Sequence, residues 1–120
     1  MKIVVVDDSK TMRMIVKRTL RQAGYGDHEV LEAGNGVEAL DIIKSSTPNL
    51  ILCDWNMPEM NGLELLQALN TAGIKTNFGF VTSEGTPEMR QVAEENGALF
   101  LISKPFSAET FQEHFSGVLS

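Results

Sequence analysis

Cysteine is nearly missing from this chain, which has a single thiol, Cys53, among its 120 residues. Because Cys53 lies alone inside an apolar run, the sequence excludes a disulfide framework and favours a reducing compartment. Long apolar segments are also missing, since no run approaches the roughly 18–20 residues that a membrane-spanning helix needs. The amino terminus, MKIVVVDD, has one lysine and then two acids, which is not the pattern of a signal peptide. We therefore expect a cytoplasmic protein.

Positive charge is in short supply as well. Lys and Arg total 10 against 16 Asp and Glu, which gives a formal net charge of −6. Nucleic acids and anionic membrane surfaces attract an excess of positive charge, so this balance disfavours both as partners. The length suits one domain over residues 1–120, and no repeat or low-complexity linker divides it.

Apolar runs typical of strands alternate with helical patterns along the chain. Strands are expected at 2–6, 28–33, 49–53, 77–81 and 98–102, and helices at 9–23, 36–46, 62–70, 86–97 and from Ser107 to Leu119. The first run, KIVVV, is continuously apolar, as a strand buried on both faces should be, whereas HEVLEA is more polar and suits a sheet edge. Gly79, inside the fourth strand, would let a helix pack closely. The alternation predicts an α/β fold, a doubly wound five-stranded parallel sheet with helices on both faces.

Residues able to do chemistry follow the expected strands. Asp7 and Asp8 come after the first strand, Asp54 after the third, Thr82 after the fourth and Lys104 after the fifth. Ligands of open α/β sheets bind beyond the carboxyl ends of the strands, so these side chains would meet on one rim. Each has an ordinary alternative: the paired acids can cap a helix, the threonine can favour a strand, and the lysine can be a solvated charge. Their joint placement favours a functional site.

The electrostatics of such a rim predicts a bound cation. Two carboxylates about 4 Å apart repel by roughly 4 kcal/mol at an effective dielectric of about 20, so three need a cation to stay ionised. We expect Mg²⁺, because it prefers oxygen ligands and typically binds one or two carboxylates plus a phosphate. His28 and His114 are expected on the surface, away from the rim. The remaining nucleophile is a carboxylate, which can form an aspartyl phosphate.

Four segments, VVVDDSKTMRMI, LILCDWNMPEMNGLELL, VTSE and ISKPF, resemble the receiver domain of two-component response regulators. The likeness covers essentially the whole chain, and it is greatest to the single-domain chemotaxis regulators of the CheY type. The resemblance implies a flavodoxin-like sheet of order 2-1-3-4-5. It also implies a phosphorelay function, in which Asp54 is the phosphoacceptor.

The resemblance gives a role to each residue of the rim. The implied Mg²⁺ ligands are Asp7, Asp8, Asp54 and, through its backbone carbonyl, Asn56, with one of the first two acting through water. Thr82 and Lys104 would contact the phosphoryl group, and the Lys104–Pro105 peptide bond would be cis.

The resemblance also implies protein partners. A sensor histidine kinase would supply the phosphoryl group, and a downstream target would bind the surface formed by residues 86–119. The flagellar motor switch is a candidate target, a phosphatase is a further candidate partner, and the domain is expected to be a monomer in chemotaxis or motility signalling. The alternatives are a fragment of a longer regulator, a non-motility phosphorelay, or an interaction module with a degenerate site.

One position departs from the family pattern. The last strand of receivers usually carries Tyr or Phe at its middle, which swings inward when the threonine moves toward the phosphoryl group, but here Leu101 stands there. Phe100 cannot substitute, because a one-residue step moves a side chain to the other face of a strand. Leucine presents no hydroxyl to a partner, which weakens the case for the motor switch as the target and leaves the phosphorylation chemistry untouched.

Two other protein classes fit the sequence less well. A haloacid-dehalogenase-type phosphatase needs a second acid two residues after its nucleophile, and from Asp7 that position is Ser9. A flavodoxin-like binder of FMN needs a phosphate loop rich in hydroxyls and glycine after the first strand. The loop here, DDSKT, begins with two acids that would repel a phosphate.

Overall fold

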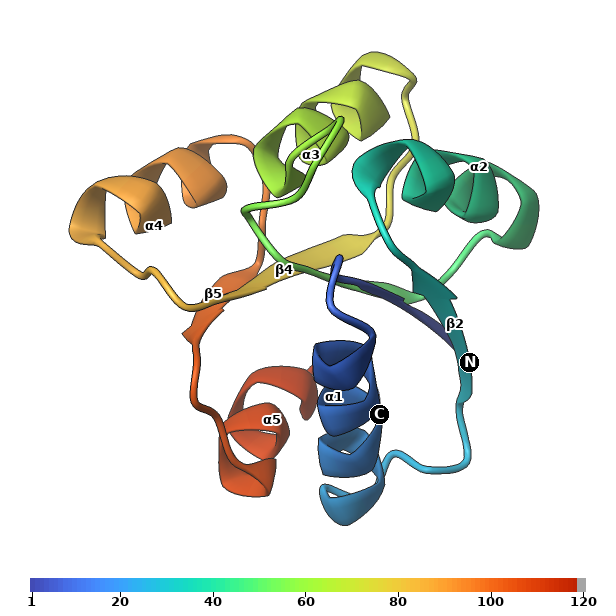
Figure 1. Ribbon diagram of the computed structural model, residues 1–120, viewed down its shortest axis with the longest axis vertical. Coiled ribbons are helices and arrows are strands. Elements are labelled where there is room, and N and C mark those ends of the chain that lie inside the picture. Colours follow the sequence, from blue (N-terminus) through green and yellow to red (C-terminus); the bar gives the residue numbers. More distant parts are fainter. Residues whose placement is uncertain (119–120) are drawn as a thin grey trace.

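The computed structural model describes residues 1–118, which form one parallel sheet with helices on both faces (Figure 1). Its strands are β1 (Lys2–Val6), β2 (Glu29–Ala33), β3 (Leu50–Cys53), β4 (Asn77–Thr82) and β5 (Phe100–Ser103). Its helices are α1 (Lys10–Gln22), α2 (Gly36–Ser46), α3 (Gly62–Thr71), α4 (Pro87–Glu95) and α5 (Ala108–Phe115). The strand order is β2-β1-β3-β4-β5, so the predicted fold class and order are confirmed. No helix within residues 1–118 has both the length and the apolar character to span a membrane.

The strands bury side chains on both faces of the sheet because their apolar runs are continuous. Alternate residues of β1 illustrate this: Val4 and Val6 belong to one buried cluster, and Ile3 and Val5 belong to the other. In Figure 1, α2, α3 and α4 lie on one side of the sheet and α1 and α5 on the other. The cluster on the first side includes Ile51, Leu65, Leu69, Phe78, Phe80, Ala93 and Leu101. The cluster on the second side includes Val16, Leu20, Leu52, Ile102, Phe111 and Phe115.

The last two helices begin where their capping residues predict. The Thr86 side chain accepts a hydrogen bond from the Met89 amide, and Pro87 stands at the first helical position. Ser107 caps α5, and the rings of Phe106 and Phe111 stack with their centroids 4.8 Å apart, as a hydrophobic staple requires.

The predicted extent of α5 is wrong. The helix ends at Phe115, with Ser116 as its C-cap. The next residue is Gly117, which has a low helix propensity. Leu119, which we predicted to lie on the same face as Phe111, falls outside the described residues.

Gly79 makes room for an aromatic ring of the neighbouring strand rather than for a helix. A Cβ atom on Gly79 would lie 2.1 Å from Cε1 of Phe100, the residue paired with Gly79 across β4 and β5. The Phe100 ring also packs against Phe115 of α5, with centroids 5.4 Å apart. The helix contact predicted for this glycine is therefore replaced by a cross-strand contact.

Gly79→Ala should lower the free energy of unfolding by about 1–3 kcal/mol, because the added methyl group must displace the Phe100 ring from a packed core. Urea unfolding followed by circular dichroism measures the change. Gly117→Ala is the matched control, since a Cβ there meets no atom within 4 Å. An unchanged unfolding midpoint for Gly79→Ala would contradict the close approach of this ring.

Candidate functional site

The hydrogen-bond ladder of the sheet fixes the positions of Asp7 and Asp54. The Asp7 amide donates to the Ala33 carbonyl at 3.1 Å, and the Asp54 amide donates to the Val6 carbonyl at 2.9 Å. Both acids are thus the first residues beyond adjacent parallel strands, β1 and β3. The backbone, rather than a mobile loop, places them side by side on the predicted rim.

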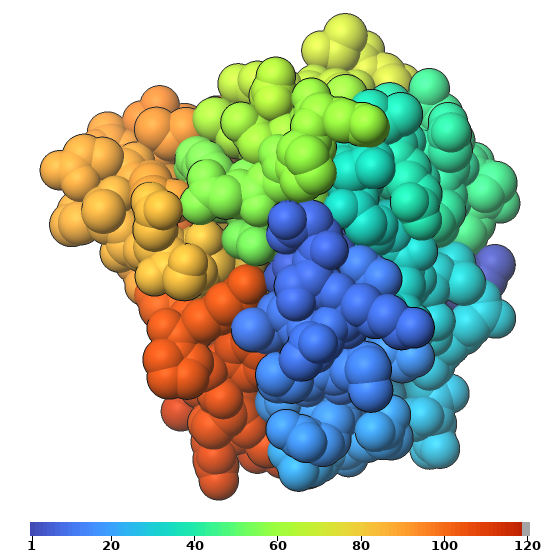
Figure 2. Space-filling view, viewed as in Figure 1, coloured from blue at the N-terminus to red at the C-terminus, as the bar shows by residue number. Residues whose placement is uncertain are grey.

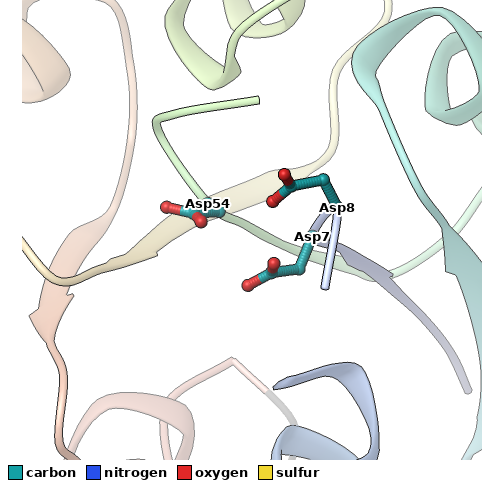
Figure 3. Close-up of side chains that lie close together, drawn as sticks. All are labelled: Asp7, Asp8 and Asp54. Carbon is teal, nitrogen blue, oxygen red and sulfur yellow. The ribbon is translucent and has the colours of Figure 1, made fainter. Parts of the chain in front are cut away.

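The carboxylates of Asp7, Asp8 and Asp54 gather at one place. Each offers an oxygen atom, and these atoms lie within 4.8 Å of one another (Figure 3). The side chains of Asp7 and Asp54 are only 6% and 12% exposed, whereas Asp8 is exposed to solvent. Carboxylate oxygens that face solvent on one side are the donor set of a hard cation that keeps some of its waters. These residues therefore fit a divalent metal ion.

Lys104 joins the acids from the end of β5. Its Nζ lies 3.1 Å from Oδ2 of Asp7 and 3.4 Å from Oδ2 of Asp54. The other oxygen of Asp7, Oδ1, accepts a hydrogen bond from the Ser9 amide at 2.9 Å. The lysine is therefore an ion-pair partner rather than a solvated charge. The peptide bond that follows it, Lys104–Pro105, is cis, as the family resemblance implies.

Thr82 completes the rim from β4. It is fully buried, and its Oγ1 accepts a hydrogen bond from the Glu84 amide at 3.4 Å. The Lys104 amide donates to the Thr82 carbonyl at 2.8 Å, so the two rim residues are linked through their backbones. In Figure 2 the start of α1 in blue, the segment after β3 in green and the segment after β5 in orange-red adjoin on the surface.

Glu84 is a residue near the site that the sequence did not single out. Nδ2 of Asn56 donates to Oε1 of Glu84 at 3.3 Å, which joins the loops after β3 and β4. We expected only the backbone carbonyl of Asn56 to matter. The sequence did contain a signal for this contact. Asn56 stands two residues after Asp54, Glu84 stands two residues after Thr82, and the strands β3 and β4 that precede them are neighbours.

The histidines lie away from the rim but are half-buried rather than exposed. His28 precedes β2, at the opposite end of that strand from the rim, and its ring lies 6.0 Å from that of Tyr25. His114 donates through Nδ1 to the Thr110 carbonyl at 2.8 Å and packs against Phe100. Their aromatic neighbours explain the burial that we did not predict.

Burial is the main influence on the pKa values of Asp54 and Cys53. It raises the pKa of Asp54; the Lys104 ammonium works in the opposite direction, and the negative charge of Asp7 adds to the rise. Burial also raises the pKa of the Cys53 thiol, with further contributions from the negative charges of Asp54 and Asp7. Cys53 is thus a protonated core residue. Burial destabilises the ionised form of Asp54, and a bound cation would offset this destabilisation.

Asp54→Asn should stabilise the metal-free protein near pH 7. Folding raises the pKa of Asp54, so the native state binds this proton more tightly than the unfolded state and loses stability as pH rises above the ordinary value of 3.8. The gain from Asn should therefore disappear below that pH. Urea unfolding at a series of pH values, in buffer containing a chelator, measures both effects. Asp41→Asn, which changes an exposed acid of α2, is the control, and a gain for Asp54→Asn that is equal at all pH values would contradict the prediction.

Comparison with known proteins identifies the family. The family described as the response regulator receiver domain matches residues 3–116. The chain belongs to this receiver family. The receiver is 42% identical, over 122 aligned residues, to the chemotaxis protein CheY homolog of Campylobacter jejuni, an alignment that covers 99% of this chain and 92% of that protein. It is 40% identical to chemotaxis protein CheY1 of Helicobacter pylori, with 99% and 97% covered.

A solved structure supports the same assignment. Chemotaxis protein CheY4 of Vibrio cholerae superposes on this receiver with a TM-score of 0.85 at 35% identity, covering 98% of both chains. The predicted resemblance and fold are therefore confirmed, and the protein is a signalling domain of the response-regulator type.

Proposed function

We propose that this receiver accepts a phosphoryl group on Asp54, in a Mg²⁺-dependent reaction, and thereby switches a surface that binds a partner. The observation that carries the proposal is the contact of Lys104 with Asp7 and Asp54, two of the three clustered carboxylates. The lysine ammonium has three donors, so these two contacts leave one donor for a further oxygen. A lysine held between acids that repel each other is thus placed to bind the oxygens of an incoming phosphoryl group.

In the proposed reaction, a carboxylate oxygen of Asp54 attacks the phosphorus atom of a phosphohistidine. The phosphorus–nitrogen bond breaks, and the imidazole leaves with its electron pair and takes a proton from solvent. Lys104 moves from the acids to a phosphoryl oxygen, and the Thr82 hydroxyl donates to another. Bound Mg²⁺ would neutralise charge on the phosphoryl oxygens. The residues proposed to hold it are Asp7, Asp8, Asp54 and, through its backbone carbonyl, Asn56.

The partners we propose follow from this reaction and from the relatives. A sensor histidine kinase would be the donor, and a downstream protein would be the target. The relatives named above are chemotaxis proteins, which supports a role in chemotaxis for this chain, with the flagellar motor switch as one candidate target. A phosphatase partner, a monomeric state, a cytoplasmic location and a single domain over residues 1–120 stay predictions of the sequence. The chain would be a phosphoacceptor that catalyses only its own phosphorylation and dephosphorylation.

Acetyl phosphate tests the reaction without a kinase. Incubation with acetyl phosphate and Mg²⁺ should add one phosphoryl group, seen as an increase in intact mass, and a chelator should prevent the addition. If the mass stays unchanged in the presence of Mg²⁺, the proposed reaction is wrong and the domain is an interaction module.

The output surface is proposed to comprise α4, β5 and α5, within residues 86–119, of which residue 119 lies outside the described part. Leu101 is the candidate relay to this surface. It is 5% exposed, pairs with Phe80 across the sheet, and therefore faces the same side as Thr82, two residues farther along β4. Ala93 of α4 belongs to the same buried cluster as Leu101, so a rotamer change of Leu101 would alter the packing of that helix.

Leu101→Ala should leave phosphorylation intact and reduce the amide shifts that phosphorylation produces in α4 and β5. A smaller side chain cannot follow the movement of Thr82, and leucine acts by packing alone. Two-dimensional NMR with acetyl phosphate and Mg²⁺ measures the shifts. Leu99→Ala is the control, because that leucine is 54% exposed. Shifts of full size in Leu101→Ala would show that the signal leaves the site by another route.

A further inference from the structure

Arg90 links helix α4 to the last strand by polar contacts. Its Nη1 donates to the carbonyl of Leu101 at 2.9 Å, and its Nη2 lies 3.2 Å from Oγ of Ser103. Ser103 directly precedes Lys104, the lysine of the proposed phosphorylation site. One guanidinium group therefore contacts both the backbone of the strand that carries the candidate relay and the residue beside the site.

The loop before α4 packs onto the same atoms. A Cβ atom on Gly85 would lie 2.4 Å from Oγ of Ser103, and 3.4 Å from both Nη2 of Arg90 and Cδ2 of Leu101. A side chain at this position would displace the Ser103 hydroxyl from its place beside Arg90. We call this convergence of Gly85, Arg90, Leu101 and Ser103 the arginine clamp.

Two segments of the arginine clamp adjoin the site along the chain, the loop after β4 and the end of β5. On β4, Oγ1 of Thr82 accepts from the Glu84 amide, and Gly85 is the next residue. On β5, the Lys104 amide donates to the Thr82 carbonyl, and Ser103 is the residue before it. Gly85 is thus three residues from Thr82, and Ser103 is one residue from Lys104, so a movement of either site residue would displace the neighbouring part of the arginine clamp.

We propose that Arg90 is a positioning residue that couples the phosphorylation site to helix α4; the inference rests on the proposed phosphorylation of Asp54. In the unphosphorylated protein the guanidinium holds α4 against the carboxyl end of β5. Phosphorylation draws Lys104 and its neighbour Ser103 out of this arrangement, the bond from Arg90 to Ser103 is lost, and α4 is released. Arg90 thus supplies the polar link between site and surface that Leu101 cannot make.

The properties of the guanidinium suit this role. Its planar fork can engage the Leu101 carbonyl and the Ser103 hydroxyl together, which the single ammonium group of a lysine does less well. The bond from Arg90 to the Ser103 hydroxyl is exposed to solvent, so it contributes little to global stability and can be broken at low cost. A coupling element must have two arrangements of similar free energy, and an exposed hydrogen bond to a strand end meets that condition.

The experiment compares amide spectra of native protein, Arg90→Met, Arg90→Lys and Ser103→Ala before and after addition of acetyl phosphate and Mg²⁺. We expect Arg90→Met to shift the resonances of residues 87–95 in the unphosphorylated protein. In this variant, the amide shift changes that phosphorylation produces in residues 87–95 should be less than half as large as in the native protein. Ser103→Ala should act in the same direction, Arg90→Lys should be intermediate, and Arg90→Met with Ser103→Ala combined should add nothing to Arg90→Met alone.

Gln91→Met is the matched control, since Gln91 is the exposed neighbour on the same helix, and within residues 1–118 no side-chain hydrogen bond joins it to β5. The proposal would be overturned if phosphorylation changed the α4 amide shifts in both Arg90→Met and Ser103→Ala as much as in the native protein, whatever happens to the melting temperature. The increase in intact mass on phosphorylation separates this failure from failure of the proposed function. Unlabelled native protein would overturn both, whereas labelled variants with a full α4 response overturn only the role of Arg90.

Discussion

Asp54→Asn should accept no phosphoryl group from acetyl phosphate in the presence of Mg²⁺. The amide of asparagine is a poor nucleophile, so the variant keeps the shape of the side chain but loses the attacking oxygen. Asp54 is also one of the two carboxylates that Lys104 contacts, at 3.4 Å, which places it where the phosphoryl oxygens would be bound. Intact-mass spectrometry over a time course measures the loss, which should be complete within the sensitivity of the method.

A matched control separates loss of the nucleophile from loss of charge. Asp41→Asn removes one negative charge from the exposed face of α2 and should be phosphorylated like the native protein. If Asp54→Asn gained the same mass as the native protein, the phosphoacceptor would have to be another residue, and the assignment of the site would be wrong. Peptide mapping of the labelled native protein then locates the group independently.

Asp8→Ala should weaken Mg²⁺ binding at least about tenfold. Changing a group that merely orients a metal ligand already costs roughly 10–100-fold in affinity, and this substitution removes one of the clustered carboxylates outright. Trp55 provides the signal, because it follows Asp54 directly and its ring lies 4.6 Å from that of Phe80. A titration of tryptophan fluorescence with MgCl₂ gives the affinity of each variant.

Asp27→Ala is the control for this titration, since it removes an exposed acid that precedes β2, at the end of that strand away from the rim. It should leave the midpoint unchanged. A titration of Asp8→Ala that matches the native curve would show that the acid after Asp7 does not hold the ion, and the proposed ligand set would need revision.

The sequence by itself determined which residues could meet at one edge of the sheet. The continuous apolar run of β1 indicated burial on both faces, and the acids that follow it indicated the rim. Parallel strands present their carboxyl ends on the same side, so the approach of Asp7 and Asp54 required only that β1 and β3 be neighbours. The strand order came from the family resemblance, because periodicity in a single sequence does not specify which strands pair.

Only the tertiary structure decided the contacts between segments that no local pattern relates. The Phe100 ring over Gly79 depends on the register of β4 and β5. Asn56 reaches Glu84 across 28 residues, and Arg90 reaches Ser103 across 13. Local sequence encodes the period of each helix and strand, whereas side-chain contacts between loops and helices depend on the paths that the connections take. The rim could therefore be predicted from residue types at strand ends, and the arginine clamp could not.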